Sequence, residues 1–211
     1  MCLLVVDMQR YYLEDTSPFF RYTEHRYPGA MSYIARRCRD IVIPNLIVLL
    51  TAARRRHIPI VYLKLCGEER DRGDLHPSFR RLDEEAVRDG FGHVYPRDSE
   101  PLSDIIPALA PKPNDRVLRK TTFSGFTSSN LDDHLRQMDI GILLTTGLAT
   151  SQCVETTARD AADRGYRIVH VEDAQADYSR DMHRASLHAS QGVCGGEILK
   201  TARVIRMLAR E

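Results

Sequence analysis

The sequence predicts an α/β fold in which a doubly wound, mostly parallel six-stranded sheet is flanked by helices. Short runs rich in β-branched residues alternate with helical patterns along the 211 residues. The first of them, residues 2–6, is fully apolar, and continuous apolar runs of this length suit strands that are covered on both faces of a parallel sheet. No internal repeat, low-complexity tract or linker interrupts the alternation, so we expect a single domain over residues 1–211.

The predicted strands are short apolar segments bounded by turn residues or by the start of a helical pattern. Pro59 leads into the second strand, and the turn sequence at 113–115 precedes the third. The six strands are expected at residues 2–6, 58–65, 116–118, 140–146, 167–171 and 193–199.

Helical patterns fill the segments between these strands, which gives right-handed crossovers in a doubly wound sheet. Pro44 suits the first position of a helix, the arginines at 54–56 favour its C-terminal end, and Gly165 suits a C-cap. The predicted helices are 30–39, 44–57, 79–88, 129–138, 151–164, 181–191 and 201–208. The weakly periodic stretch around the 79–88 helix, residues 67–103, is expected to carry a lid or an oligomer contact.

Composition excludes several classes of protein. Hydrophobic residues make up 43% and charged residues 28% of the chain, which is too apolar for a disordered protein. The net charge of +1 provides no field that would attract nucleic acid or an anionic membrane surface. We therefore expect a small-molecule partner, with no nucleic acid and no membrane.

The cysteines and the N-terminal segment bear on the compartment. Five cysteines, an odd number at irregular spacing, fit neither a disulfide framework nor a zinc-ligand pattern. The first residues lack the basic region and the small-residue cleavage site of a signal peptide, and no apolar run approaches the ~20 residues of a membrane helix. The sequence predicts a reduced cytoplasmic protein.

Three reactive side chains are expected at the carboxyl ends of strands, where open parallel sheets carry their chemistry. Asp7 follows the first strand, Lys120 follows the third, and Cys153 lies in the first turn of the helix after the fourth. A helix N-terminus and a nearby ammonium both lower the pKa of a thiol. Singly, each residue has an ordinary explanation as a turn residue, a surface lysine or a buried thiol. Together they predict a nucleophile, a stabilising cation and a proton shuttle.

Three segments around these residues resemble the isochorismatase-like cysteine hydrolases. Residues 4–9, LVVDMQ, resemble the opening of that family, and residues 119–126, RKTTFSGF, resemble its lysine motif. Residues 147–161, GLATSQCVETTARDA, resemble its nucleophile motif and are the most specific of the three.

The resemblance implies a flavodoxin-like three-layer α/β/α sandwich, an Asp7–Lys120–Cys153 triad and no cofactor. It also implies a cis peptide bond at 148–149, which would turn the N–H of Ala149 towards the site. Beside the N–H of Cys153, that amide would complete an oxyanion hole. Family members are usually homodimers or homotetramers, so we expect one of these states.

The presence of Cys153 favours hydrolysis of an amide C–N bond through a thioester. The 33-residue spacing from Lys120 to Cys153 resembles that of the branch of the family that cleaves carbamoyl and ureido compounds. The expected substrate is therefore a small carboxamide or an N-carbamoyl or ureido compound. Tyr12 and Phe123 are candidate walls of the pocket, and Gln152 is a candidate hydrogen-bond partner for a ureido group. Core packing is an equal alternative for Tyr12.

Four alternatives follow from the same residues. A nicotinamidase-like amidase would hold a metal with Asp74, His76 and His93, but Asp74 lies too far beyond the second strand, so no metal is expected. A catalytically silent relative would act as a binding or scaffold protein. A redox-sensing thiol protein lacks a second cysteine near Cys153 in the sequence. A flavin or nucleotide binder would need a glycine-rich loop after the first strand, and residues 8–12 contain no glycine.

Overall fold

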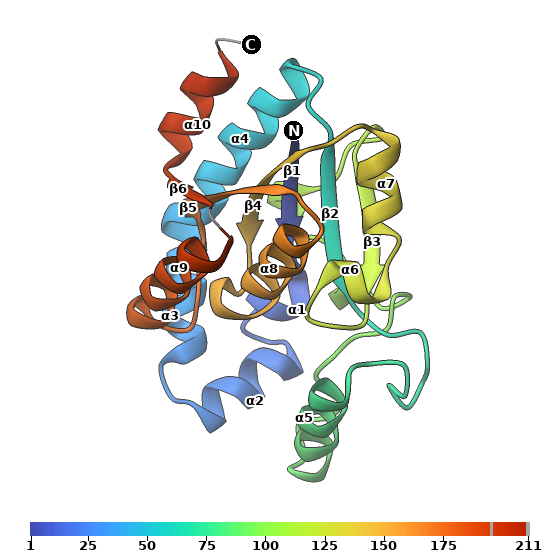
Figure 1. The fold of residues 1–211 in the computed structure, drawn as a ribbon. Coiled ribbons are helices and arrows are strands. Elements are labelled where there is room, and N and C mark those ends of the chain that lie inside the picture. Colours follow the sequence, from blue (N-terminus) through green and yellow to red (C-terminus); the bar gives the residue numbers. More distant parts are fainter. Residues whose placement is uncertain (195, 210–211) are drawn as a thin grey trace.

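The computed structural model describes residues 1–194 and 196–209, and their strands form one parallel sheet. The strand order is β3-β2-β1-β4-β5-β6, so the order reverses between β1 and β4. Helices cover both faces of the sheet (Figure 1), which confirms the predicted α/β sandwich. The strands are β1 (Cys2–Val6), β2 (Ile60–Leu65), β3 (Arg116–Lys120), β4 (Ile142–Gly147), β5 (Arg167–Gln175) and β6 (Glu197–Leu199).

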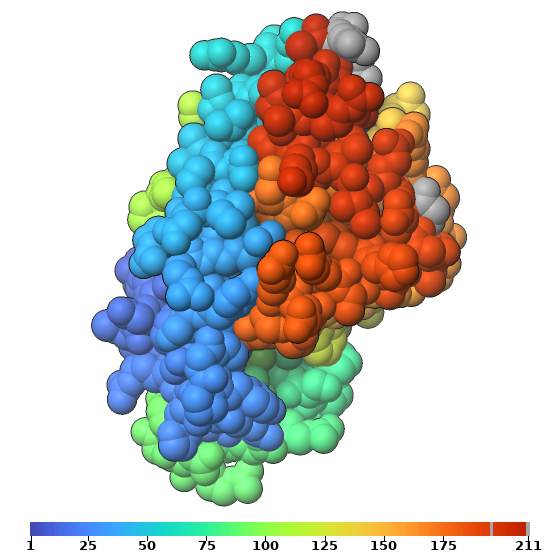
Figure 2. Space-filling view, turned by 90° about the vertical axis from the view of Figure 1, so that its left-hand side faces the viewer, coloured from blue at the N-terminus to red at the C-terminus, as the bar shows by residue number. Residues whose placement is uncertain are grey.

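The helices divide between the two faces and the carboxyl edge of the sheet. They are α1 (Arg10–Leu13), α2 (Pro18–Arg26), α3 (Ala30–Arg37), α4 (Ile43–Arg55), α5 (Pro77–Arg88), α6 (Gly125–Ser128), α7 (Leu131–Gln137), α8 (Glu155–Asp163), α9 (Arg180–Cys194) and α10 (Thr201–Leu208). Short helical turns are η1 (Cys38–Val42), η2 (Pro101–Ser103), η3 (Pro107–Leu109) and η4 (Thr150–Val154). Figure 1 places α2 and α5 beyond the carboxyl ends of the central strands. Figure 2 shows α10 lying along α4.

Two hydrophobic clusters fill the layers on either side of the sheet, and β1 contributes to both. Leu3 and Val5 belong to the cluster under α3, α4 and α10, while Leu4 and Val6 belong to the cluster under α7 and α8. The strand is fully buried on both faces, which explains why its sequence is apolar at every position. No helix in the described ranges has the length and apolarity needed to cross a membrane.

The strand boundaries differ from the prediction by a few residues. β3 and β5 are longer than predicted because their pairing with neighbouring strands continues to Lys120 and Gln175. β6 is shorter, because α9 continues to Cys194 and leaves three residues for the strand. The extension of β3 brings Lys120 into the last position of the strand.

The prediction that Pro44 begins a new helix is wrong. The chain is helical without a break from Ala30 to Arg55, and Pro44 lies in the second position of α4. The wide π-helical turn η1 precedes it, and there Ile43 N–H donates to the carbonyl of Cys38. Such a turn accommodates a residue that lacks an N–H inside a helix.

Helices α1 and α2 are absent from the predicted set, although the start of α2 carries an N-terminal signal. The Ser17 hydroxyl accepts a hydrogen bond from Phe20 N–H, and Pro18 occupies the first turn. The two helices are short, and their buried aromatic residues give no strong helical periodicity. They matter for function because α2 lines the cavity described below.

Candidate active site

Asp7 directly follows β1 at the carboxyl edge of the sheet, beside the point where the strand order reverses. Its side chain is buried and its backbone adopts a positive φ of 50°, which is uncommon for a residue other than glycine. The Asp7 N–H donates to the carbonyl of Leu63 on β2, which keeps the residue in line with the sheet. Ligands bind to doubly wound sheets at this reversal point.

Lys120 ends β3, and its ammonium is completely buried. Nζ donates to Asp7 Oδ2 at 2.8 Å and to the carbonyl of Thr122 at 3.1 Å, and it lies 3.3 Å from Cys153 Sγ. These three partners match the three N–H bonds of an ammonium group. The prediction that Asp7, Lys120 and Cys153 converge is therefore confirmed in the geometry of the site.

Cys153 lies in η4, the π-helical turn that leads from the end of β4 into α8. Its side chain is buried, and its carbonyl accepts a hydrogen bond of 2.6 Å from the Thr157 hydroxyl one turn later. π-helical turns are rare and occur frequently at functional sites. The turn orients Sγ towards Lys120.

Asp7, Lys120 and Cys153 form a buried cluster in which the charge of each group depends on the other two. Burial raises the pKa of the Cys153 thiol, and the Lys120 ammonium only partly opposes this effect. The expectation of a lowered thiol pKa therefore fails for the resting site, because burial outweighs the ammonium. Burial also raises the pKa of Asp7, again against the effect of Lys120. For Lys120, burial favours the neutral amine, but Asp7 and Cys153 outweigh it and raise the pKa.

A single buried ammonium can neutralise only one anion. A second anion in the cluster would remain uncompensated at a high cost. Asp7 and Cys153 therefore share one proton when Lys120 is charged, and the negative charge lies either on the carboxylate or on the sulfur. Asp7 Oδ1 and the buried Tyr11 hydroxyl have no hydrogen-bond partner within the described residues.

Gly147 allows β4 to pass close to β1 next to Asp7. Its φ is 102°, and a Cβ atom there would come within 2.0 Å of the carbonyl oxygen of Val6. The following Leu148 N–H donates to that same oxygen at 2.9 Å. The site therefore requires glycine at this position.

The expected cis peptide bond at 148–149 is wrong, because the described chain contains no cis peptide bond. The turn is made by the positive φ of Gly147 and by the hydrogen bond from Thr150 N–H to the carbonyl of Ala176, so the cost of a non-proline cis bond is avoided. The Ala149 N–H donates to no acceptor in the part of the chain that the structure describes.

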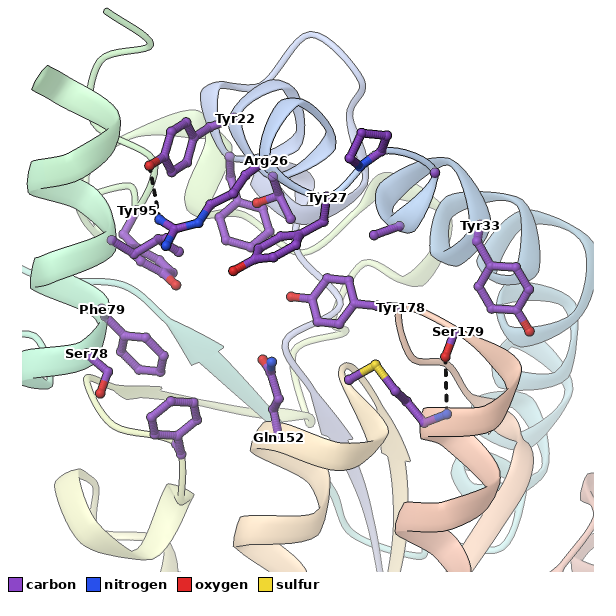
Figure 3. Close-up of a pocket in the computed structure, with 18 residues that line it drawn as sticks. Tyr22, Arg26, Tyr27, Tyr33, Ser78, Phe79, Tyr95, Gln152, Tyr178 and Ser179 are labelled. Carbon is purple, nitrogen blue, oxygen red and sulfur yellow. Dashed lines mark hydrogen bonds between the residues drawn. The ribbon is translucent and has the colours of Figure 1, made fainter. Parts of the chain in front are cut away.

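A cavity of about 900 Å³ lies beside the buried cluster, although none of Asp7, Lys120 and Cys153 is among the residues that line it. Phe123 and Gln152 line it, as the sequence predicts for substrate-contacting residues. Tyr12 does not line it. Tyr12 is buried behind Tyr178, and the two hydroxyls are 2.5 Å apart, so Tyr12 holds a wall residue in place. Figure 3 shows Gln152 pointing into the cavity between Phe79 and Tyr178.

Residues 1–203 match the family model described as the isochorismatase domain. The chain belongs to the isochorismatase family. The ureidoacrylate amidohydrolase of Variovorax paradoxus is 46% identical over 71 residues, which cover 34% of this chain and 28% of the relative. Nicotinamidase 3 of Arabidopsis thaliana is 24% identical over 186 residues, which cover 88% of this chain and 77% of that protein. The chain thus spans less than a third of the length of the ureidoacrylate relative that it matches.

Solved structures of this isochorismatase family share the fold. A family protein from Desulfovibrio vulgaris superposes with a TM-score of 0.79 at 24% identity, covering 99% of this chain and 98% of the other. The N-carbamoylsarcosine amidase of Thermoplasma acidophilum superposes with a TM-score of 0.64 at 26% identity, covering 95% of both chains.

The three residues of the metal alternative are engaged elsewhere in this isochorismatase-family chain. The Asp74 carboxylate accepts from the backbone N–H groups of Glu68 and Glu69, while His76 Nδ1 accepts from Ser78 N–H. The ring of His93 is 2.6 Å from the buried Asp83 carboxylate. Within the described ranges, no group of three or more His, Cys, Asp or Glu is arranged to hold a metal ion. The donor set therefore does not fit a metal site.

Two residues that support the isochorismatase-family site were missed by sequence reasoning. The Gln9 amide bonds to both the N–H and the carbonyl of Leu65 and to the carbonyl of Ser103, which ties the ends of β1 and β2 to the segment 67–103. Asp177 accepts from Ser151 N–H at 2.6 Å and from Tyr178 N–H at 2.8 Å. Asp177 follows the unexpectedly long β5, so its position could not be anticipated from the predicted strand end.

Proposed function

We propose that this protein is a cysteine-dependent amidohydrolase that cleaves a C–N bond of a small carboxamide or of an N-carbamoyl or ureido compound. The observation that carries the proposal is the buried Lys120 ammonium, which contacts both the Asp7 carboxylate and the Cys153 sulfur. The names of the relatives, amidohydrolase, nicotinamidase and amidase, support the same bond type. Asp7, Lys120 and Cys153 act as a catalytic triad.

In the first half of the reaction, Asp7 takes the thiol proton and Sγ of Cys153 attacks the carbonyl carbon. The C=O electron pair moves to oxygen. The oxyanion accepts hydrogen bonds from the Cys153 N–H and from the Ala149 N–H, which has no acceptor within the described residues although the expected cis peptide bond is absent. Losing one such donor typically costs about 3–4 kcal/mol of barrier. The C–N bond then breaks, its electron pair leaves with nitrogen, and Asp7 returns the proton to the departing ammonia or amine.

In the second half, water hydrolyses the thioester. Asp7 takes a proton from the attacking water, the C–S bond breaks, and the sulfur receives the electron pair next to Lys120. The acid product leaves and the thiol regains its proton from Asp7. The cluster holds one negative charge beside one ammonium at each stage, which is the charge that a buried site with one cation tolerates.

Ammonia release over a panel of amides, ureides and nicotinamide tests the proposal. Purified Cys153→Ala and Cys153→Ser variants are expected to lose turnover, and acid-quenched wild-type enzyme is expected to carry the acyl group as a mass increase. Cys194→Ala is the matched control, because it removes a half-buried thiol from α9.

Retained turnover in Cys153→Ala contradicts cysteine catalysis. Absence of turnover over the whole panel, combined with no acyl mass increase on wild-type protein, favours the alternative of a catalytically silent binding protein. We also expect a homodimer or homotetramer, which the molecular mass in solution tests.

A further inference from the structure

The cavity next to Cys153 has an aromatic lining that a very small polar amide would not need. Aromatic side chains make up eight of its lining residues, and Leu82 and Met182 add further apolar surface. The volume of about 900 Å³ lies near the upper end of the range for small-molecule pockets, roughly 300–1,000 Å³. This space admits a substrate with a sizeable substituent.

The cavity lies next to Cys153, although Cys153 is not among the residues that line it. Gln152 lines it and precedes the nucleophile in the chain, and Phe123 lines it just beyond Lys120. Tyr95 and Tyr178 line it as well, and both lie close enough to Cys153 for that group to contribute to their raised pKa, although burial is the larger cause. A substituent attached to the scissile carbonyl therefore extends into this cavity.

The aromatic walls are held in fixed positions. The Phe79 ring lies 4.4 Å from that of Phe123 and 5.1 Å from that of Tyr95, measured between centroids. On the opposite side, Tyr178 is stacked on Tyr12 and hydrogen-bonded to it. Figure 3 shows Phe79 and Tyr178 on opposite sides of the space. Preformed aromatic walls favour a ligand that presents a flat or branched apolar group.

The charged side chain that lines the cavity already has a partner of opposite charge. Arg26 is the one charged side chain among the lining residues that the structure describes. Its Nη1 donates to the Glu85 carboxylate and, at 3.3 Å, to the Tyr22 hydroxyl, as Figure 3 shows for the tyrosine. The guanidinium also lies 5.7 Å from the ring centroid of Tyr27. A substrate carboxylate would have to compete with Glu85, and an unpaired carboxylate is costly against an apolar wall.

We infer that the preferred substrates are uncharged primary carboxamides or monosubstituted ureas that carry an aromatic or branched apolar substituent. The inference rests on the proposed function and narrows its substrate class. It predicts discrimination against anionic amides and ureides of similar length. Gln152 at the base of the cavity supplies hydrogen bonds to the amide or ureide group, and the aromatic walls bind the substituent.

Two matched pairs of substrates test the inference at pH 8. Benzylurea is compared with ureidoacetate, and 3-phenylpropanamide with succinamate, by the rate of ammonia release. We expect kcat/KM for the neutral member of each pair to exceed that of the anion by at least about tenfold. Equal rates, or a preference for the anions, would overturn the inference while leaving the proposed function intact.

The Arg26–Glu85 pair provides a second test. Glu85→Gln releases the guanidinium, so kcat/KM for ureidoacetate is expected to rise by about tenfold relative to benzylurea. Glu84→Gln is the matched control, because it removes the same charge from an exposed neighbouring position of α5 and leaves Arg26 paired. If the ratio of kcat/KM between ureidoacetate and benzylurea is unchanged in Glu85→Gln, then pairing of Arg26 with Glu85 does not explain discrimination against anionic substrates.

Binding separates a failure of catalysis from a failure of the inferred specificity. If wild-type protein hydrolyses none of the four compounds, the proposed function fails for this class of substrate. The thermal shift of Cys153→Ala with benzylurea and with ureidoacetate then decides the pocket's preference. A larger shift with benzylurea supports the inference, and a larger or equal shift with ureidoacetate overturns it.

Discussion

Replacing Lys120 by methionine tests the electrostatics of the cluster directly. The side chains of Asp7 and Lys120 are at most 2% exposed, and their charged atoms are 2.8 Å apart. At an effective dielectric constant of ~20 this separation corresponds to an attraction of about 6 kcal/mol, which the cost of removing both charges from water partly offsets. Removing one partner of a buried pair typically costs about 3–5 kcal/mol, because the other charge is left uncompensated. We expect a loss of this size for Lys120→Met at pH 8.

The loss should depend on pH in a defined direction. Without the ammonium, burial raises the pKa of Asp7 further, so the folded variant binds a proton that the unfolded chain releases. Stability of Lys120→Met therefore falls as pH rises between the unfolded and the folded pKa of Asp7, by up to about 1.4 kcal/mol per pH unit. The variant is expected to be closer to wild type at pH 6 than at pH 8.

The double variant Asp7→Asn/Lys120→Met removes both charges and is expected to regain at least half of the lost stability at pH 8. Asparagine suits the positive φ of 50° at this position, so the comparison adds little backbone strain. Urea unfolding followed by circular dichroism and tyrosine fluorescence measures the effect, since the chain has no tryptophan. A loss below about 1 kcal/mol in Lys120→Met, or a double variant no more stable than it, would refute the reasoning.

Three further predictions concern the surroundings of the cluster. Gly147→Ala is expected to lose several kcal/mol of stability and most activity, because its Cβ would lie 2.0 Å from a carbonyl oxygen of β1. Gly141→Ala is the control, since a Cβ there meets nothing within 4 Å. Chemical denaturation and turnover of both variants measure the difference. Tyr12→Phe removes the hydrogen bond to Tyr178, so we expect a loss of about 1 kcal/mol and a raised KM with a smaller change in kcat, measured by steady-state kinetics. Burial lowers the pKa of His183 from 6.5 to about 4, so between these pH values the unfolded chain binds a proton that the folded chain does not. Stability therefore falls by up to ~3 kcal/mol as pH drops from 6.5 to 4. His183→Gln should lack this part of the fall, which urea titrations across the same pH range measure.

The central part of the site could be predicted from the sequence because it follows from one rule of parallel sheets. Asp7, Lys120 and Cys153 lie at or after the ends of three short strands, and the carboxyl ends of parallel strands meet at one edge of the sheet. The identity of the strands was sufficient for this step. Errors of a few residues at their ends did not matter, because each reactive residue lies at or just after a strand end.

The surroundings of the site could not be predicted, because they depend on tertiary packing. Tyr95 and Phe79 reach the cavity from the segment 67–103. The local sequence of this segment does not indicate which part of the molecule it packs against. Tyr12 lies behind Tyr178 and does not itself line the cavity. No local sequence pattern distinguishes a residue that lines a cavity from one that packs behind the lining. The direction of the pKa shift of Cys153 was wrong because the depth of burial, which exceeds the effect of the neighbouring charge, is known only from the fold.

The distances along the chain between the reactive residues have a consequence for biosynthesis. Asp7 and Lys120 are 113 positions apart, and Cys153 follows 33 positions later. Contacts of such long range form only after the entropy of closing the intervening loops has been offset, so they belong to the last stages of assembly. A nascent polypeptide therefore carries five thiols without the contacts to Asp7 and Lys120, and only the folded molecule brings those groups to Cys153. Under the proposed function, reactivity of Cys153 is therefore acquired together with the native state, and acylation of the growing chain is avoided.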